Sequence, residues 1–192
     1  MNPFEKESYD LTYSTDVRLK RHYTGIDYFV IWENIMSKLN KTDRLLDLGC
    51  GPGHLANMLY DNEFKEYTGI DFSRVAIAQA KEKAPSYVFI EANLYDIDFN
   101  DYSDFKFISV ETFEHLENDI AIIKKLPKNE IFFSVPNFKS SSHYRTYDDE
   151  EFIKKYYEDV LTISNIQSFV MGRNSLAVGG ISKIYVVEAN IK

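Results

Sequence analysis

Apolar and polar residues alternate in blocks along this chain of 192 residues. Apolar side chains recur at helical spacing through residues 26–40, which predicts an amphipathic helix. Short apolar runs bounded by turn residues follow, and they predict strands at 44–48, 67–70, 87–91, 105–110 and 130–135. Further helices are predicted from the glycine bend to about Asp61, from Ser73 to just before Pro85, around 120–126 and over 147–160.

The end of the chain has a different pattern. Residues 161–170 and 181–189 are two β-rich runs around the Gly-containing segment MGRNSLAVGG, which predicts an antiparallel pair at the edge of a sheet. The preceding alternation of strands and helices predicts a Rossmann-like α/β fold, a doubly wound and mostly parallel sheet with helices on both faces. We expect one domain over 1–192, with a core at 26–192 after an N-terminal segment at 1–25.

Composition narrows the functional classes. The formal net charge of −8 disfavours a broad surface for nucleic-acid phosphates, so we expect no nucleic-acid partner. No apolar run approaches the ~20 residues of a membrane span, and the first residues are polar, so neither a membrane partner nor a signal peptide is expected. Cys50 is the only cysteine, which excludes an internal disulfide and fits a cytoplasmic location.

The stretch RLLDLGCGPGHL places three glycines between a predicted strand and a predicted helix. Without Cβ atoms at Gly49, Gly51 and Gly53, a ligand can lie almost against the backbone and face the free N–H groups of the helix. Asp71 ends the next strand, twenty residues after Gly51, where a carboxylate can accept hydrogen bonds from both hydroxyls of a ribose. The pattern therefore predicts a nucleoside cofactor.

The details of this bend favour a cationic nucleoside. Dinucleotide sites usually have the pattern GxGxxG, whereas here the sixth position is His54. Asp47 stands just before the bend, where its charge would repel a pyrophosphate and attract an ammonium or sulfonium group. S-adenosyl-L-methionine (SAM) fits better than a nicotinamide dinucleotide, although an NAD(P)-dependent oxidoreductase stays open as an alternative.

Four segments, in order, resemble the motifs of class I SAM-dependent methyltransferases. They are LLDLGCGPGHL, YTGIDFS, ISVETFEHL and FFSVPNF, and the likeness covers roughly residues 26–190. The last of them resembles a strand-end motif of members that act on small molecules. The resemblance implies a seven-stranded sheet whose last pair is an antiparallel hairpin.

The resemblance also implies cofactor contacts. The methionine end would be held by Asp47 and by the loop of Gly49, Cys50, Gly51 and Gly53, and Glu111 would lie near the methionine or the methyl group. Asp71 would bind the ribose, with Phe72, Asn93 and Leu94 beside the adenine. Packing for Phe72, a turn role for Asn93 and a filler role for Cys50 remain open.

In similar enzymes an N-terminal segment folds over the cofactor as a lid. Tyr13 or Tyr23 in residues 1–25 would then contact the cofactor or the acceptor. A terminal extension with one docked aromatic side chain is the alternative reading.

The acceptor side is predicted from the loops after the fourth and fifth strands. His143 and His115 are candidate general bases there, although each could equally be a loop histidine bonded to backbone. Arg145 is a candidate for binding a carboxylate or phosphate of the acceptor, with surface solvation as the alternative, and Tyr147 is a second candidate acceptor contact. His54 is expected to be structural because a helix N-terminus disfavours imidazolium.

Metal chemistry is not expected from the sequence. Glu111, Glu114, His115 and Asp119 are residue types that bind metals, but their spacing matches no established metal motif. The function predicted is therefore metal-independent transfer of a methyl group from SAM to an oxygen or nitrogen of a small-molecule acceptor, leaving S-adenosyl-L-homocysteine. A SAM-binding regulator or adaptor without catalysis is an alternative, and a monomer and a homodimer are both compatible with the sequence.

Overall fold

The computed structural model describes residues 5–173 and 176–192. Residues 1–4 of the predicted N-terminal segment and residues 174–175 of the predicted hairpin loop lie outside the described residues. The chain divides into two compact units, Met1–Ile97 and Asp98–Lys192, and each is described by itself. Among the described residues no helix combines the length and the apolar character needed to cross a membrane.

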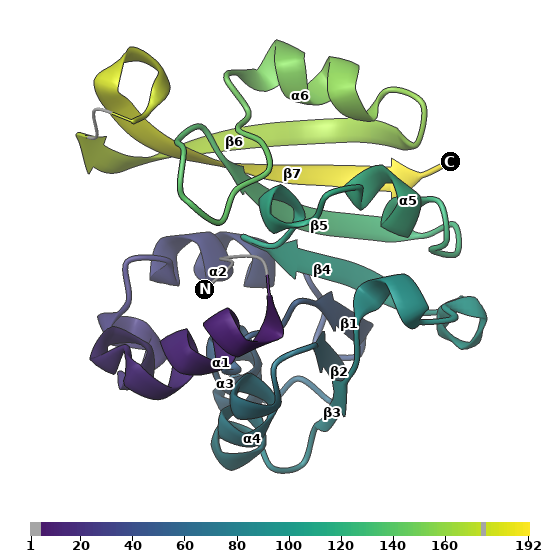
Figure 1. Cartoon of the computed structure of the whole chain (residues 1–192). Helices are drawn as coiled ribbons and strands as arrows, with labels where there is room; N and C mark the ends of the chain where they lie inside the picture. Colours follow the sequence, from purple (N-terminus) through teal and green to yellow (C-terminus); the bar gives the residue numbers. More distant parts are fainter. Residues whose placement is uncertain (1–4, 174–175) are drawn as a thin grey trace. The chain divides into compact units, whose positions relative to one another are not determined.

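The first unit contains three parallel strands flanked by helices (Figure 1). The strands are β1 (Arg44–Leu48), β2 (Glu66–Asp71) and β3 (Val88–Glu91), in the order β3-β2-β1. The helices are α1 (Lys6–Thr15), α2 (Phe29–Met36), α3 (His54–Asp61) and α4 (Arg74–Lys83), with single 3-10 turns η1 (Val17–Lys20), η2 (Tyr23–Gly25) and η3 (Leu94–Asp96).

Burial explains why these strands read as continuous apolar runs. Leu45, Leu46 and Leu48 of β1 are fully buried, as is Ile70 of β2, because a parallel strand is covered on both faces. Leu48 pairs with Ile70, so the carboxyl ends of β1 and β2 lie side by side. This pairing brings the glycine bend after β1 next to Asp71, the last residue of β2.

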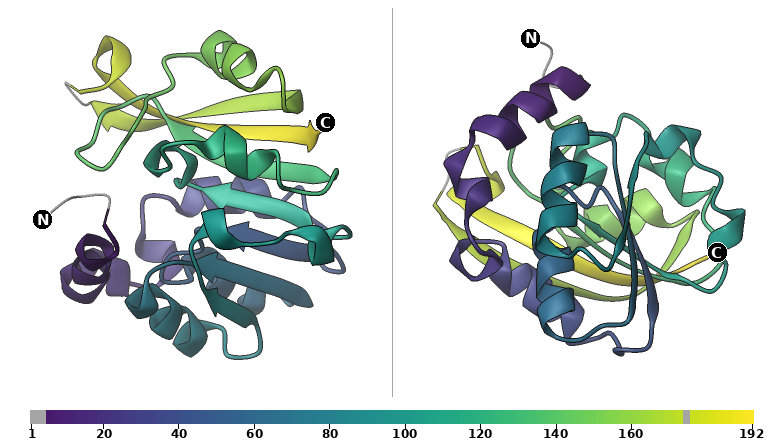
Figure 2. Two further views of the ribbon diagram at one scale, coloured as in Figure 1. Left: turned by 45° about the vertical axis from the view of Figure 1, so that its right-hand side comes forward. Right: turned by 90° about the horizontal axis from the view of Figure 1, so that it is seen from below.

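The second unit contains four strands in the order β4-β5-β7-β6. They are β4 (Lys106–Val110), β5 (Glu130–Pro136), β6 (Leu161–Arg173) and β7 (Ile181–Ile191), and β7 runs antiparallel to both of its neighbours. Figure 2 shows the long β6–β7 pair. The helices are α5 (Asp119–Ile123) and α6 (Glu150–Tyr157), with 3-10 turns η4 (Asn100–Tyr102), η5 (Phe113–His115) and η6 (Val178–Gly180).

The observed elements follow the predicted ones closely. The antiparallel pair at the end of the chain is confirmed, and both strands are longer than predicted. The predicted helix at 147–160 shortens to Glu150–Tyr157 because the Asp149 carboxylate accepts the N–H of Phe152 and caps the first turn. The helix α1 was not predicted, since the sequence indicated only an N-terminal segment there.

Candidate functional site

The glycine bend is a left-handed loop tied to the end of β2. Gly49, Gly51 and Gly53 have φ angles of 80°, 52° and 77°, a region that side chains with a Cβ rarely adopt. The N–H groups of Gly49 and Cys50 both donate to the carbonyl of Ile70, at 2.8 and 3.0 Å. Backbone hydrogen bonds to β2 therefore hold the loop, and its three glycines carry no side chains.

Two of the glycines nearby serve packing. A Cβ on Gly53 would lie 2.7 Å from the Cα and Cβ of Ala80, so this glycine lets α3 approach α4. A Cβ on Gly69 would lie 2.8 Å from the sulfur of Cys50. Cys50 is buried against that glycine, and burial raises the pKa of its thiol well above the usual range, which favours the role of a small filler over that of a nucleophile.

Asp71 holds the glycine loop in place. Its carboxylate accepts the N–H of Gly51 at 2.9 Å and the N–H of Ser73 at 2.8 Å. Burial is the main cause that raises the pKa of Asp71 to about 6. Each carboxylate oxygen has a second lone pair, so the same side chain can fix the loop and accept ligand hydroxyls.

Asp47 is a second buried carboxylate in this unit. It accepts the hydroxyl of Tyr67 at 2.6 Å and is 2% exposed. Burial first, and then the negative charge of Asp71, raise the pKa of Asp47 to about 7. The charge of Asp71 disfavours the anion of Asp47, and a positively charged group beside them, such as the sulfonium or ammonium group of SAM, would favour it.

Tyr13 covers the loop from the N-terminal helix. Its hydroxyl oxygen lies 3.4 Å from the position that a Cβ on Gly51 would take, and burial raises the pKa of this hydroxyl well above its usual range. The helix α1 is anchored on α4: the hydroxyl of Ser73 donates to Asp10, and Gln79 donates to the carbonyl of Tyr13 at 2.9 Å. Tyr13 therefore lies against the loop at Gly51.

Other predicted cofactor contacts have clear local roles. Tyr23 is buried and hydrogen-bonded to Asp61, the last residue of α3, which places it at the end of that helix opposite to the glycine loop. Phe72 lies edge-on to Tyr9 of α1, with ring centroids 5.0 Å apart. The Asn93 side chain accepts the N–H of Tyr95 at 3.0 Å, which is the turn role that the sequence left open. Leu94 is buried.

His54 has the structural role expected for it. Its ring stacks on Trp32 with centroids 5.6 Å apart, and it is 5% exposed. Burial is the main cause that lowers the pKa of His54 to about 4, so the ring is neutral at the start of α3.

In the second unit, Glu111 directly follows β4 and has a strained backbone conformation. Its φ angle is 51°, uncommon for a residue with a side chain. The hydroxyl of Ser134 on β5 accepts the N–H of Glu111 at 3.0 Å and donates to its carboxylate at 2.8 Å. Burial raises the pKa of Glu111 to about 7. Such strain held by a neighbouring strand is typical of functional positions.

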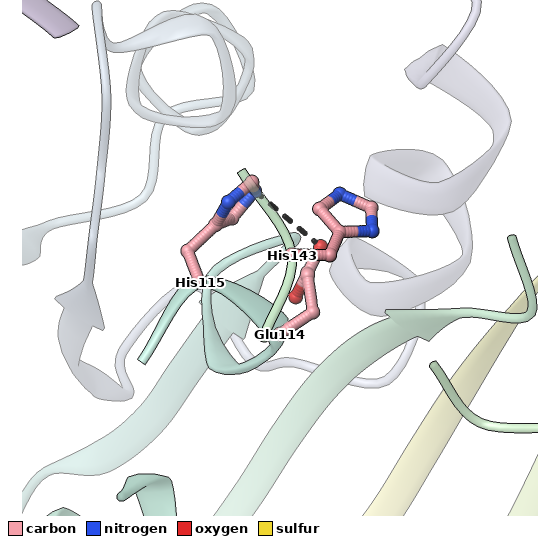
Figure 3. A group of neighbouring side chains, drawn as sticks. All are labelled: Glu114, His115 and His143. Carbon is pink, nitrogen blue, oxygen red and sulfur yellow. Dashed lines mark ion pairs between the residues drawn. The ribbon is translucent and has the colours of Figure 1, made fainter. Parts of the chain in front are cut away.

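Directly after this strand, Glu114, His115 and His143 form a close group (Figure 3). The Nε2 of His115 lies 3.7 Å from a carboxylate oxygen of Glu114, and the two imidazole rings meet edge to face with centroids 4.8 Å apart. The Nδ1 atoms face the backbone carbonyls of Ser142 at 2.7 Å and Phe138 at 3.1 Å. The structure therefore brings both predicted histidines together and adds Glu114.

Burial sets the charge of this group. It is the main cause that lowers the pKa of His115 to about 4, and it lowers the pKa of His143 as well. Burial, with the neighbouring charge of Glu111 second, raises the pKa of Glu114 well above its usual range. Both imidazoles are therefore neutral at pH 7.

Arg145 and Tyr147, the predicted acceptor contacts, have other partners in this structure. The guanidinium of Arg145 donates to the carbonyls of Phe113, Leu116 and Glu117 and pairs with Asp119 at 3.0 Å. Its donors are thus committed to the loop that follows β4. Tyr147 is fully buried, and its hydroxyl lies 2.8 Å from that of Tyr157, so its ring belongs to the core.

Sequence reasoning missed the centre of this core network. The buried carboxylate of Asp119 accepts the hydroxyls of Tyr156 at 2.8 Å and Tyr157 at 2.7 Å in addition to its pairing with Arg145. The adjacent tyrosines of the segment KKYYED were the one available signal, but their partner lies far away in the sequence.

Comparison with known proteins agrees with this geometry. Residues 45–127 match the family model described as a methyltransferase domain. Among curated proteins, 57 residues are 39% identical to trans-aconitate 2-methyltransferase of Rhodopseudomonas palustris (strain BisA53), which is 29% of this chain and 22% of that protein. A second match, to an eEF1A lysine and N-terminal methyltransferase homolog of Drosophila pseudoobscura pseudoobscura, is 30% identical over 81 residues.

These curated matches are partial. The second covers 40% of this chain and 12% of the relative, so the chain spans less than a quarter of the length of either protein. Among solved structures, the N-methyltransferase NodS from Bradyrhizobium japonicum WM9, in complex with S-adenosyl-L-homocysteine, superposes with a TM-score of 0.70. That alignment covers 100% of this chain and 99% of NodS at 15% identity, and so it shows the fold.

The fold class predicted from the alternation of strands and helices is confirmed, and so is the seven-stranded sheet that the resemblance implied. The described residues contain seven strands, and the last two form the predicted antiparallel pair. The glycine bend follows the first strand, as the sequence motif predicted. Residues 45–127 therefore match a methyltransferase-domain model, and the chain has the fold of the class I SAM-dependent methyltransferases.

Proposed function

We propose that this protein transfers the methyl group of SAM to an oxygen or nitrogen atom of a small-molecule acceptor. The observation that carries the proposal is the glycine loop of the first unit, where three left-handed glycines form a bare backbone surface that Asp71 fixes by a hydrogen bond. The methyltransferase domain match over 45–127 and the binding of S-adenosyl-L-homocysteine by NodS support the choice of cofactor.

The chain's own residues would position the cofactor. Asp71 has lone pairs for the ribose hydroxyls, and Asp47 would supply negative charge near the methionine end once a bound cation favours its ionised form. Tyr13 would close over the loop and exclude water from it. SAM supplies an activated methyl group when bound, so the methyl-transfer step itself is proposed to need no metal at the reacting carbon. Orientation is then the main contribution of the protein, worth about 7–11 kcal/mol in favourable cases.

The acceptor must also lose a proton. His115 and His143 are the proposed bases, and the Nε2 atoms would receive the proton because each Nδ1 faces a backbone carbonyl. The low pKa of His115, about 4, makes it a weak base at neutral pH. This leaves His143 as the better candidate for that role.

Titration calorimetry with SAM tests the cofactor assignment. Asp71→Ala removes the carboxylate that organises the loop, and we expect SAM affinity to fall roughly 5- to 150-fold, which corresponds to about 1–3 kcal/mol for unpaired buried polar groups. Asp101→Ala, at an exposed aspartate of the second unit, is the control and should leave the affinity unchanged. Equal affinity of wild type and Asp71→Ala would reject the assignment.

Turnover is tested separately. A panel of small oxygen and nitrogen acceptors is incubated with the protein and SAM, and formation of S-adenosyl-L-homocysteine is measured. Product formation that requires both an acceptor and intact Asp71 supports the enzyme. Firm SAM binding with no product for any acceptor would favour the non-catalytic regulator, and stabilisation by NAD(P)H without any by SAM would favour the oxidoreductase.

A further inference from the structure

Glu114 is a fully buried carboxyl group without a hydrogen-bond partner. Its side chain is 0% exposed, and neither of its carboxylate oxygens has a hydrogen-bond partner in the structure. A buried carboxyl group without such partners costs several kcal/mol, and native proteins rarely keep one without a reason. Arg145, a cation of the same loop region, forms its ion pair with Asp119.

Two imidazoles face this carboxylate. One ligand atom from each of Glu114, His115 and His143 can be chosen so that all three lie within 4.8 Å of one another. The dashed line in Figure 3 joins the Nε2 of His115 to a Glu114 oxygen, which are 3.7 Å apart. Histidines that bind metals through Nε2 typically direct Nδ1–H to a carbonyl or carboxylate, and both histidines here have a backbone carbonyl at Nδ1.

We propose that Glu114, His115 and His143 bind one divalent first-row transition metal ion, of the class of Zn²⁺, Co²⁺ or Mn²⁺. Two imidazole nitrogens and one carboxylate oxygen are a donor set of these ions, whereas Mg²⁺ prefers oxygen ligands throughout. Bonds of about 2.0–2.2 Å in a tetrahedral site put ligand atoms roughly 3.4 Å apart, so small side-chain rotations close the observed arrangement. Three protein ligands leave a position open for an oxygen or nitrogen of another molecule.

The three residues do not form a motif that can be recognised from the sequence, because the third lies far from the other two along the chain. Glu114 and His115 are adjacent on η5, and His143 comes from the loop after β5. The backbone N–H of Tyr144 donates to the carbonyl of Glu114 at 2.8 Å, and this contact holds the two loops together. The inference does not depend on methyl transfer, since it rests on the second unit alone. An Nε2 atom that binds a metal ion has no lone pair left for a proton, so the base role proposed above belongs to the metal-free protein.

Metal titration of the intact, EDTA-treated protein tests the site. Calorimetry with Zn²⁺, Co²⁺ or Mn²⁺ should show one ion per chain, and Mg²⁺ should bind at least tenfold more weakly than Co²⁺. Glu114→Gln and His143→Gln should each weaken the binding of Co²⁺ at least tenfold. His22→Gln is the matched control, because His22 also lies 3.7 Å from a carboxylate, that of Asp61, but on the surface of the first unit. Its affinity should equal that of the wild type.

A second measurement uses only the wild-type protein, so its result does not depend on whether the variants fold. In the wild type, substoichiometric Mn²⁺ should broaden the ring proton signals of His115 and His143 before those of His22 and His54 in the NMR spectrum. Equal broadening of all four histidines, no binding of any of the three ions, or unchanged Co²⁺ affinity in folded Glu114→Gln and His143→Gln would overturn the proposal. SAM affinity is measured separately on the metal-free protein. A protein that binds SAM but no metal ion would reject this site alone, and one that binds metal but not SAM would reject the proposed function alone.

Discussion

At the scale of single residues, burial decides what the acidic side chains can do. Asp47 and Asp71 are nearly inaccessible to solvent, yet both keep hydrogen-bond partners, Tyr67 for the first and two backbone N–H groups for the second. Glu114 has no such partners. This contrast explains why we assign the first two to a cofactor loop with its own internal order and the third to a cation.

Asp47 gives a prediction about stability and pH. Its pKa is raised from 3.8 to about 7 in the folded protein, so the folded state holds this proton more tightly than the unfolded state does. The contribution of Asp47 to stability is therefore fully present below about pH 4 and is lost as the pH rises through 7. Asp47→Asn keeps an acceptor for Tyr67 and removes the titration.

We expect the free energy of unfolding of Asp47→Asn, relative to wild type, to increase between pH 4 and pH 8 by up to about 4 kcal/mol. Urea unfolding at a series of pH values measures this difference. Asp101→Asn, at an exposed aspartate, is the control and should show no such trend. A difference that stays constant over this range for Asp47→Asn would contradict the assignment.

At the scale of elements, the loop depends on how closely α3 and α4 pack. Gly53 begins α3 with a φ of 77°, and its missing Cβ is what allows contact with Ala80 of α4. A side chain there would meet backbone atoms, which cannot rotate away. The glycine that looks like part of a ligand site is therefore first a packing residue.

This role predicts a large effect of a small substitution. Gly53→Ala should destabilise the protein by about 3 kcal/mol, the sum of a left-handed alanine and an overpacked contact. Gly179→Ala is a matched control, because Gly179 has a φ of 66° but no atom within 4 Å of the added Cβ, and it should cost only about 1 kcal/mol. Thermal or urea unfolding of both variants gives the comparison, and equal losses would argue against the packing role.

At the scale of the whole molecule, charge is the dominant feature. The formal net charge of −8 attracts cationic ligands, and added salt weakens this attraction by screening it. SAM has one more positive charge than S-adenosyl-L-homocysteine because of its sulfonium. The proposed function therefore predicts that the two ligands respond differently to ionic strength.

We expect the affinity for SAM to fall more steeply than the affinity for S-adenosyl-L-homocysteine between about 20 and 500 mM salt. Titration calorimetry of both ligands in the same buffers measures the two slopes. The product serves as an internal control, since it shares the nucleoside and the amino-acid end with SAM. Equal slopes would show that the negative charge of the protein does not act on the sulfonium.

The sequence by itself determined the order and type of most elements and the position of the glycine loop. These depend on local properties: apolar periodicity, capping residues, and glycines where no Cβ fits. Asp71 was within reach of the sequence as well, because the end of a strand next to the bend is a local position in a parallel sheet. The helix α1 escaped prediction because its hydrophobic pattern is weak and its contacts are made with α4.

Only the tertiary structure decided the roles of residues whose partners are distant in the chain. Arg145 and Tyr147 had the chemistry of acceptor contacts, but the fold placed them against Asp119 and the loop after β4. The same packing brought His143 to Glu114 and His115. Spacing along the chain records which side chains are available, whereas burial and long-range pairing decide which of them meet and which still have a polar group to satisfy.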